Sequence, residues 1–416
     1  IQLCAMLYAD DFILLAETED DLQNQMNRLN VYATKYKMEV NQKKTKVMIF
    51  TLSRKKNVKS GRWKIGDLLI EEASSYKYLG VTIRNNGTFG DHITAVKEKV
   101  NKALYALIGK SIEWQGFNPQ IFMHAFNLTI VPILNYGAEI WGGNEWYELE
   151  KIHLYACKFT LGVKQSTTTD SIYAEMGRYP LFTCRKIAII KYINRLKGLS
   201  DERLAKKAFK QMCLDDIKGH YNWFSRVNDM LKDNSINYND PNEVIKKKIK
   251  ETFQKQLKGN LHEAIVNEKK LRTYARFKTI HNFESYLYKI QSFKRRSYFT
   301  RFRLGVHDLE IEKGRYSNIQ KELRFCRSCI TMKIQAVEDE LHFLLHCPFY
   351  MKERDFMLQK IEQRYPNVKI LSDENKFIWI MSQEDDDCIQ WVATYIHKAM
   401  EKRSVNVNNI LIKPTN

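Results

Sequence analysis

The chain has 416 residues, of which 44% are apolar and 28% charged, as in an ordinary core-forming protein. Its 17 Gly and 7 Pro exclude collagen-like and mostly disordered classes, and it contains no run of eighteen apolar residues that could span a membrane. Lys and Arg number 67 against 48 Asp and Glu, and the net charge of +19 favours binding to a polyanion, most often nucleic acid. Eight cysteines are too few for a disulfide scaffold and indicate a reduced, intracellular protein.

The N-terminal residues predict a region that mixes strands and a helix. Residues 1–15 consist of two short apolar runs around a turn signal, which predicts a hairpin of two buried strands. Residues 19–37 have helical spacing, with apolar positions on one face. Two further short strands are predicted at 47–52 and 78–83.

The remainder of the chain is mainly helical in pattern. Helical spacing runs from residue 92 to about 215, with Pro132 breaking or kinking one helix. Residues 215–242 are polar and rich in Asp and Asn, which predicts a linker. Lys-rich helical spacing resumes at 243–258, and a last helix is predicted around 388–403. The predicted fold is therefore α+β at the N-terminus, followed by a mainly α-helical region.

Two adjacent carboxylates, Asp10 and Asp11, separate the two apolar runs of the predicted hairpin. Burying a carboxylate without a partner is costly, so the fold has to offset that cost at this place. One interpretation is a tight turn in which the Asp side chains bond their own backbone. The other is a site for a hard cation such as Mg²⁺, which prefers carboxylate oxygens.

Three strings resemble the reverse transcriptases of non-LTR (LINE-type) retrotransposons. Tyr8-Ala9-Asp10-Asp11 resembles their catalytic hairpin, and Asn41-Gln42-Lys43-Lys44-Thr45 resembles their Asn-x-x-Lys-Thr segment. Tyr76-Lys77-Tyr78-Leu79-Gly80-Val81 is similar to the hairpin that follows the palm in this family. The strings occur in the family's order, and the resemblance implies the end of a polymerase palm followed by a helical thumb.

The resemblance also implies a reaction, RNA-directed DNA polymerisation from dNTPs, in which catalysis depends on positioning and charge neutralisation. Asp10 would be a principal ligand of a two-Mg²⁺ site and Asp11 its partner. Lys44 would face the nucleotide phosphates, although a solvated lysine in a Lys-rich turn is an equal alternative. The residues expected to contact the primer–template end are Tyr8, Ala9, Tyr78, Leu79 and Gly80. Ordinary strand packing is the alternative for the last three.

One departure from the family concerns a third aspartate, which the family carries on an earlier palm strand. Only nine residues precede Asp10, and the first of them is Ile1. We therefore expect the chain to be the C-terminal part of a polymerase, begun inside a larger open reading frame and unable to polymerise alone. The alternatives are a non-enzymatic nucleic-acid-binding relic of such an element and a protein–protein scaffold with incidental charge.

Residues 269–303 form the most basic stretch, with eleven Lys and Arg residues, one Glu and nine aromatic residues. Cations follow the phosphate backbone of nucleic acids, and aromatic rings stack on unpaired bases. For the individual rings we favour burial in a core, because large rings are usually buried. Nucleic-acid contact is instead predicted for four arginines: Arg295, Arg296, Arg301 and Arg303.

A second cluster has the residue types and spacing of a tetrahedral structural zinc site: Cys326-x2-Cys329-x12-His342-x4-Cys347. Thiolate and imidazole suit Zn²⁺ better than hard cations, and four protein ligands leave no open position for catalysis. His346 is a competing ligand that would point away. Four unrelated core residues are the alternative. The segment also resembles the C-terminal zinc-binding segment of LINE-type polymerases, which is thought to grip element RNA or target DNA.

Together these features predict five regions. They are the end of a palm (1–90), a helical thumb (91–215), a basic helical connector (216–319), a zinc-knuckle module (320–360) and a C-terminal tail (361–416). The implied partners are an RNA template and a DNA primer or target. The family's need for chromosomal DNA implies a nuclear protein with a cytoplasmic RNA–protein particle. Three more strings resemble these elements but have no assigned chemistry: 161–163, 176–181 and 300–303.

Overall fold

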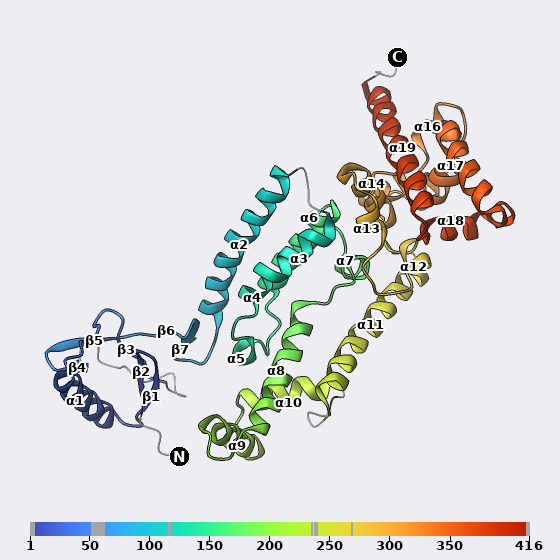
Figure 1. Ribbon diagram of the computed structural model, residues 1–416. Helices are drawn as coiled ribbons and strands as arrows, with labels where there is room; N and C mark the ends of the chain where they lie inside the picture. Colours follow the sequence, from blue (N-terminus) through green and yellow to red (C-terminus); the bar gives the residue numbers. More distant parts are fainter. Residues whose placement is uncertain are drawn as a thin grey trace. The chain divides into compact units, whose positions relative to one another are not determined.

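The computed structural model describes residues 5–50, 63–114, 118–233, 236, 240–267 and 269–412. Within these residues the protein is mainly helical, and its named strands lie near the N-terminus (Figure 1). The chain divides into two compact units, Ile1–Val96 and Lys97–Asn416. The division falls within helix α2 (Gly90–Glu113). None of the helices in the described ranges is both long and apolar enough to cross a bilayer.

The described residues of the first unit form three small sheets. Its strands are β1 (Ala5–Tyr8), β2 (Asp11–Leu14), β3 (Lys46–Val47), β4 (Trp63–Ile65), β5 (Leu68–Glu72), β6 (Ser75–Tyr78) and β7 (Val81–Arg84). The pairs β1–β2 and β6–β7 are antiparallel hairpins, and β5 lies between antiparallel β4 and parallel β3. The predicted N-terminal hairpin is confirmed, although residues 1–4 lie outside the described part. The strand predicted at 47–52 is shorter, and residues 51 and 52 are not among those described.

Helix α1 (Glu19–Lys35) covers the core of this unit. The Thr18 hydroxyl accepts a hydrogen bond from the Asp21 amide at 3.2 Å, which satisfies a free donor of the first turn. The buried core comprises Met26, Val47, Trp63, Ile65 and Ile70. Leu14, at the end of β2, packs against this cluster and so anchors the N-terminal hairpin to the unit.

The second unit begins, after α2, with short helices joined by tight turns. They are α3 (Pro119–Thr129), α4 (Val131–Leu134), α5 (Ala138–Trp141), α6 (Tyr147–Leu161) and α7 (Thr169–Met176). The chain breaks at Ile130 between α3 and α4, and Pro132 occupies the first turn of α4. The predicted break at this proline is therefore confirmed, because its ring is tolerated only where no amide donor is required.

Four helices form a group with its own core: α8 (Leu181–Gly198), α9 (Leu204–Ile217), α10 (Trp223–Asp233) and α11 (Asn242–Val266). Helices α8 and α11 pack side by side (Figure 1). The linker predicted at 215–242 is wrong, because that segment contains α10, whose Phe224, Val227 and Leu231 are buried in this core. Its polar composition concealed apolar positions at helical spacing.

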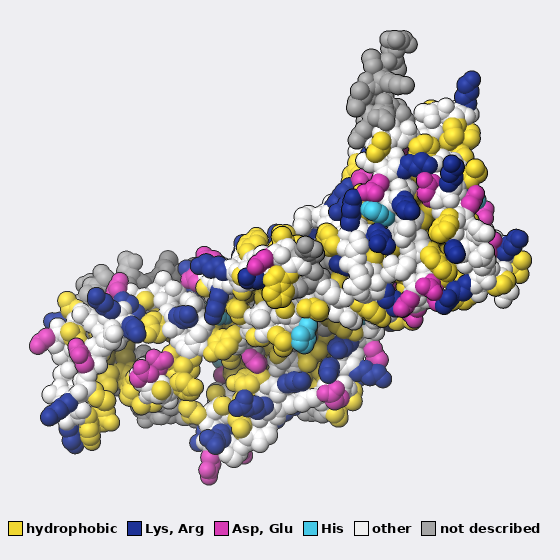
Figure 2. All heavy atoms as spheres, turned by 45° about the horizontal axis from the view of Figure 1, so that its top comes forward, with side chains coloured by type: hydrophobic (Ala, Val, Ile, Leu, Met, Phe, Trp, Pro, Cys, Tyr) yellow, Lys and Arg dark blue, Asp and Glu magenta, His cyan; other side chains and the backbone are white. Residues whose placement is uncertain are grey.

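The C-terminal part of the second unit contains the remaining elements. They are α12 (Tyr274–Phe277), α13 (Tyr286–Lys289), α14 (Phe293–Arg303), α15 (Glu310–Tyr316), η1 (Lys321–Leu323), α16 (Arg327–Ile330), the π-helical turn η2 (His342–His346), η3 (Pro348–Tyr350), α17 (Met351–Arg364), η4 (Pro366–Ile370), α18 (Asp373–Met381) and α19 (Asp386–Ile412). Helix α19 packs against α14 and α17, and it confirms and extends the last predicted helix. On the face drawn in Figure 2, Lys and Arg side chains are dispersed among apolar and acidic ones.

Candidate functional site

The two adjacent aspartates lie at the turn of the β1–β2 hairpin. Tyr8 pairs with Asp11, so Ala9 and Asp10 form a two-residue turn. Ala9 has a φ of +53°, a left-handed conformation that costs a residue with a Cβ about 1–2 kcal/mol. Such a position is usually filled by Gly or Asn, and strain of this kind is concentrated at functional sites. Both carboxylates are exposed to solvent.

Large apolar side chains border this acidic turn. Leu7, Tyr8 and Phe12 are all exposed on the two strands beside the carboxylates. Beyond β2, the Gln25 side chain donates a hydrogen bond from Nε2 to the Leu15 carbonyl at 2.8 Å, which ties the hairpin to α1. The hairpin is therefore fastened at its base, while its tip presents two acids next to apolar surface.

Lys44 lies in a separate turn that precedes β3. The Asn41 side chain and carbonyl accept hydrogen bonds from the Lys44 amide at 3.1 and 3.2 Å, which shapes the turn. The Lys44 side chain is exposed. Among the described residues, no hydrogen bond or ion pair joins Lys44 to Asp10 or Asp11. The predicted catalytic lysine thus shares the unit with the acidic turn without touching it.

The Tyr-Leu-Gly string forms the turn of the β6–β7 hairpin. Tyr78 pairs with Val81, and the two turn residues, Leu79 and Gly80, have φ values of +45° and +84°. Positive φ at both central residues is the type I′ geometry that matches strand twist, and a leucine there is unusual. Sequence reasoning missed His92 of α2, which is buried and accepts a hydrogen bond from the Thr82 amide at 3.3 Å. Burial, and then the nearby charge of Lys77, lowers the pKa of His92.

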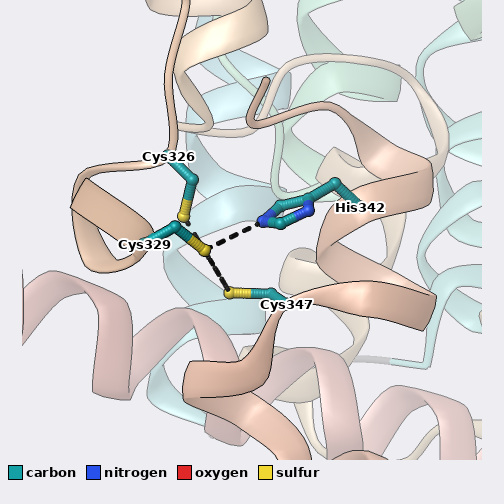
Figure 3. A group of neighbouring side chains, drawn as sticks. All are labelled: Cys326, Cys329, His342 and Cys347. Atoms are coloured by element: carbon teal, nitrogen blue, oxygen red, sulfur yellow. Dashed lines mark hydrogen bonds between the residues drawn. The ribbon is translucent and has the colours of Figure 1, made fainter. Parts of the chain in front are cut away.

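The four predicted metal ligands of the second unit converge, as Figure 3 shows. Their ligand atoms all lie within 4.8 Å of one another. The Cys329 sulfur is 3.7 Å from that of Cys347 and 3.4 Å from Nε2 of His342, and the Cys326 sulfur is 3.9 Å from that of Cys347. Tetrahedral Zn–S bonds of about 2.3 Å would place two sulfurs about 3.8 Å apart, so these spacings fit a zinc ion.

Local structure brings these ligands together. Cys326 immediately precedes α16 and Cys329 lies within it, whereas His342 and Cys347 lie at the two ends of η2. The Asp339 carboxylate accepts a hydrogen bond from the His342 amide at 2.7 Å and fixes the start of η2. The exposed His346 lies 3.3 Å from an acidic side chain of α18, outside the cluster.

Two thiols of the cluster, those of Cys326 and Cys329, have raised pKa values. A hydrogen bond with Cys347, together with burial, raises the pKa of Cys326 well above its usual range. Burial, and then the neighbouring Cys326, raises the pKa of Cys329 to about 12. Thiolates so close together repel one another, and a bound divalent cation would offset that repulsion. The donor set therefore fits a soft or borderline metal ion.

A buried ion pair fastens α19 to the metal cluster. Arg403 donates from Nε and Nη2 to the Glu338 carboxylate at 2.8 and 2.6 Å. The same carboxylate accepts a hydrogen bond from the Glu310 amide at 2.7 Å and lies 3.7 Å from the Cys326 sulfur. This pair could not be predicted from the sequence, because nothing in the sequence links Glu338, in a charged segment, to Arg403, which is 65 positions away on helix α19.

A second buried carboxylate, Glu340, lies in the same segment. His307 Nε2 is 3.2 Å and Arg272 Nη2 is 3.4 Å from its oxygens. Burial acts to raise the pKa of Glu340, but the hydrogen bond and charge of His307 and the charge of Arg272 outweigh burial and lower that pKa to about 2. The acidic segment before the histidine ligand is therefore a structural support inside the protein.

Two of the four arginines predicted to contact nucleic acid are enclosed by protein. Arg303 donates from Nε to Glu175 at 2.7 Å and from Nη2 to Glu284 at 2.9 Å. Arg296 donates from Nη1 to the Ile290 carbonyl at 2.7 Å. Both side chains are buried, so contacts inside the protein replace the nucleic-acid contacts expected of them. Arg295 keeps partial exposure.

The aromatic residues of the basic stretch are mostly in the core, as predicted. The buried rings are those of Tyr274, Phe277, Tyr286, Phe299 and Phe302. The ring of Phe293, at the start of α14, is exposed. The stretch therefore contributes to the core through its rings and to the surface through only some of its cations.

Among the strings without assigned chemistry, 300–303 ends helix α14 and 161–163 packs against that helix, whereas 176–181 approaches the segment before α13. The Gly162 carbonyl accepts a hydrogen bond from Arg301 Nε at 2.8 Å, and a Cβ at Gly162 (φ +64°) would lie 2.0 Å from the Ser297 hydroxyl. A Cβ at Gly177 (φ +56°) would lie 2.5 Å from the Phe283 amide nitrogen. The glycines permit close backbone approach, so these strings act in packing.

The N-terminal part of the chain matches a known protein family. Residues 1–83 match the family described as reverse transcriptase (RNA-dependent DNA polymerase). Over 145 residues the chain is 28% identical to a probable RNA-directed DNA polymerase from transposon BS of Drosophila melanogaster. That match covers 32% of this chain and 16% of the relative. No solved structure matches the chain. The acidic hairpin lies within the matched residues, and the chain resembles the RNA-directed DNA polymerase of a non-LTR transposon.

Proposed function

We propose that the chain supplies part of an RNA-directed DNA polymerase that copies a transposon's RNA into DNA. The observation that carries this proposal is the family match over residues 1–83, which includes the exposed acidic turn at Asp10 and Asp11. The partners would be an RNA template, a DNA primer or target, and dNTPs. The resemblance also supports a nuclear site of action, with a cytoplasmic RNA–protein particle.

Each residue at the hairpins has a proposed role. Asp10 and Asp11 would hold Mg²⁺, which supplies charge neutralisation for phosphoryl transfer when it is bound. Lys44 would approach the nucleotide phosphates. The turn residues next to the primer–template end would be Tyr8, Ala9, Tyr78, Leu79 and Gly80. The strained turns support this assignment. Gly or Asn would close each hairpin with less strain, so an alanine and a leucine at positive φ indicate a role other than hairpin closure.

Each region of the chain would have its own structural role. Residues 1–90 would complete the palm, 91–215 would form the thumb and 216–319 the connector. The module at 320–360 would hold Zn²⁺ in a purely structural site, since four protein ligands complete a tetrahedral shell. The tail at 361–416 would support that module.

We expect the 416 residues on their own to be inactive in polymerisation. The hairpin provides two carboxylates, whereas the resemblance implies a site with three. A second candidate, a nucleic-acid-binding relic, is favoured by the net charge of +19, which supports binding without any chemistry.

Metal-directed cleavage tests the hairpin directly. Fe²⁺ would replace Mg²⁺, hydrogen peroxide would oxidise it to Fe³⁺ with release of a hydroxyl radical that cleaves the backbone beside Asp10, and ascorbate would regenerate Fe²⁺. Asp10→Asn should abolish that cleavage. Asp67→Asn is the matched control, because Asp67 is an exposed aspartate in the two-residue turn of the β4–β5 hairpin. Cleavage that persists in Asp10→Asn would contradict the metal site. Binding of RNA without any hairpin cleavage would favour the relic.

Primer extension with dNTPs and Mg²⁺ tests the expectation that the chain alone does not polymerise. We expect no extension by the wild-type chain. Extension that disappears in Asp10→Asn but persists in Asp67→Asn would establish a polymerase and would overturn the need for a third carboxylate.

A further inference from the structure

A small pocket lies in the second unit. It has a volume of about 110 Å³ and is lined by Lys164, Ser166, Gly305, Val306, His307, Glu312 and Tyr316. Small-molecule sites usually exceed about 300 Å³, and one water takes about 30 Å³, so this pocket fits one polar group of a few atoms. The pocket therefore suits part of a ligand better than a whole nucleotide.

Two ammonium groups lie against the loop that forms one wall of this pocket. Lys270 donates a hydrogen bond from Nζ to the Ser166 carbonyl at 3.3 Å, and Lys158 donates from Nζ to the Gln165 carbonyl at 2.6 Å. Within the described part of the chain, neither lysine has a carboxylate partner. Burial, and then the positive charge of Lys270, lowers the pKa of Lys158, so the two cations are near enough to repel. A bound anion would relieve that repulsion.

The carboxylates near the pocket are already neutralised by other cations. Asp308 pairs with Lys164 at 2.8 Å. Glu312 lies 3.4 Å from Arg272 and 2.9 Å from Arg315. Since these acids have partners of their own, they leave the charges of Lys158 and Lys270 uncompensated.

We infer that this pocket binds a phosphate group and that the phosphate belongs to a nucleic-acid strand. The phosphate chemistry follows from the two lysines and the pocket volume, whereas the choice of a strand rests on the proposed function. Tyr316, a residue of the pocket lining, is 68% exposed, and its ring offers a stacking surface for an unpaired base. Arg301 donates a hydrogen bond from Nε to the carbonyl of Gly162, two residues before Lys164. A further cation therefore borders the same loop.

The experiment compares paired lysine substitutions in the full chain. Lys158→Gln with Lys270→Gln removes the two cations that lie against the loop at the pocket's wall; this double substitution is the pocket variant. Lys352→Gln with Lys360→Gln makes the same charge change at exposed positions of α17 and serves as the control. Lys158→Arg with Lys270→Arg keeps the charge and reports whether the loop still folds. Binding of a labelled single-stranded RNA is measured by fluorescence anisotropy over a range of salt concentrations.

The pocket variant should bind the RNA about tenfold more weakly, the effect of losing one charge-assisted hydrogen bond. The slope of log affinity against log salt should fall by about 0.7, the value for one phosphate on a single strand. The α17 variant and the arginine variant should stay within about twofold of wild type. An unchanged affinity and slope in the pocket variant would overturn the assignment to a strand.

Inorganic phosphate distinguishes the two sources of the anion. In a thermal unfolding assay, phosphate should stabilise the wild-type chain more than the pocket variant. If this difference appears while RNA affinity is unchanged, the site takes free phosphate and the strand assignment is wrong. If the wild type binds no RNA yet shows the phosphate effect, the proposed function fails and the phosphate site stands. If neither effect depends on Lys158 and Lys270, the whole inference is wrong.

Discussion

Replacing Arg303 by Met would test whether a buried charge network holds the second unit together. Arg303 lies at the end of α14 and forms ion pairs with Glu175 and Glu284, and Lys278 pairs with Glu284 as well. The network therefore contains two cations and two carboxylates, all of them buried or nearly so. Its members come from three segments, namely α7, the connection between α12 and α13, and α14, so the loss of one should destabilise the packing of all three.

The magnitude follows from what remains after the substitution. Removing one partner of a buried ion pair costs about 3–5 kcal/mol, because the other partner stays charged in a medium of low dielectric constant. Glu175 would keep the hydrogen bond from the Tyr274 hydroxyl at 2.9 Å. The guanidinium also lies 4.8 Å from the ring centroid of Phe277, a contact worth about 1 kcal/mol. We therefore expect Arg303→Met to lower the free energy of local unfolding by about 4–5 kcal/mol.

Native-state hydrogen exchange of the α14 amides measures this free energy without assuming that the whole chain unfolds in one step. Lys294→Met is the control, because Lys294 lies on the same helix in an exposed pair with Glu401, and an exposed ion pair contributes little to stability, so we expect wild-type exchange. The double variant with Glu175→Gln should lose less than the sum of the single variants. A loss below about 1 kcal/mol in Arg303→Met, or strict additivity, would refute the reasoning.

Three further predictions concern other parts of the second unit. Cys329→Ser should lose the metal ion proposed for the Cys–His cluster, and hydrogen-exchange protection should fall around this cluster but not in the first unit. Retention of the metal, or unchanged protection around the cluster, would contradict this. Gly177→Ala should lower the stability by at least about 2 kcal/mol in denaturant unfolding, because its Cβ would meet backbone, whereas Gly198→Ala, with open space around it, should change little. The pKa of Glu340 is lowered from 4.5 to about 2, so its ionised carboxylate adds about 3 kcal/mol to the free energy of unfolding above pH 4.5. This stabilisation is lost as the pH falls towards 2. In Glu340→Gln the free energy of unfolding should fall less steeply between pH 4.5 and pH 2 than in the wild type. An equally steep fall in the variant and the wild type would contradict this contribution of Glu340.

Local chemistry accounts for what could be predicted from the sequence. The Cys and His ligands come as two short pairs within 22 residues, and each pair can be positioned by a single turn of helix. The β1–β2 hairpin is local in the same sense, since its turn and both strands occupy ten consecutive residues. In both cases the residue types and their spacing carry nearly all of the geometric information.

Contacts between distant segments account for what could not be predicted. Glu175 and Arg303 are 128 positions apart, and a run of arginines has the same composition whether its side chains face water or an internal carboxylate. The same applies to residues 215–242, where Asp and Asn suggested a linker although Phe224 and Val227 lie in a shared core. Composition reports the average over a segment, whereas burial depends on which few positions face another helix.

The distribution of charge matters more for function than its sum. The most basic stretch, 269–303, places its cations Arg296 and Arg303 inside the protein, where they satisfy carbonyls and carboxylates. A buried and paired cation contributes little to the field that attracts a nucleic acid, because its partner cancels it at short range. The cations that keep a net field are those without acidic partners, such as Lys158 and Lys270 beside the small pocket. A nucleic-acid interface is therefore better sought where charges are unpaired than where basic residues are most frequent.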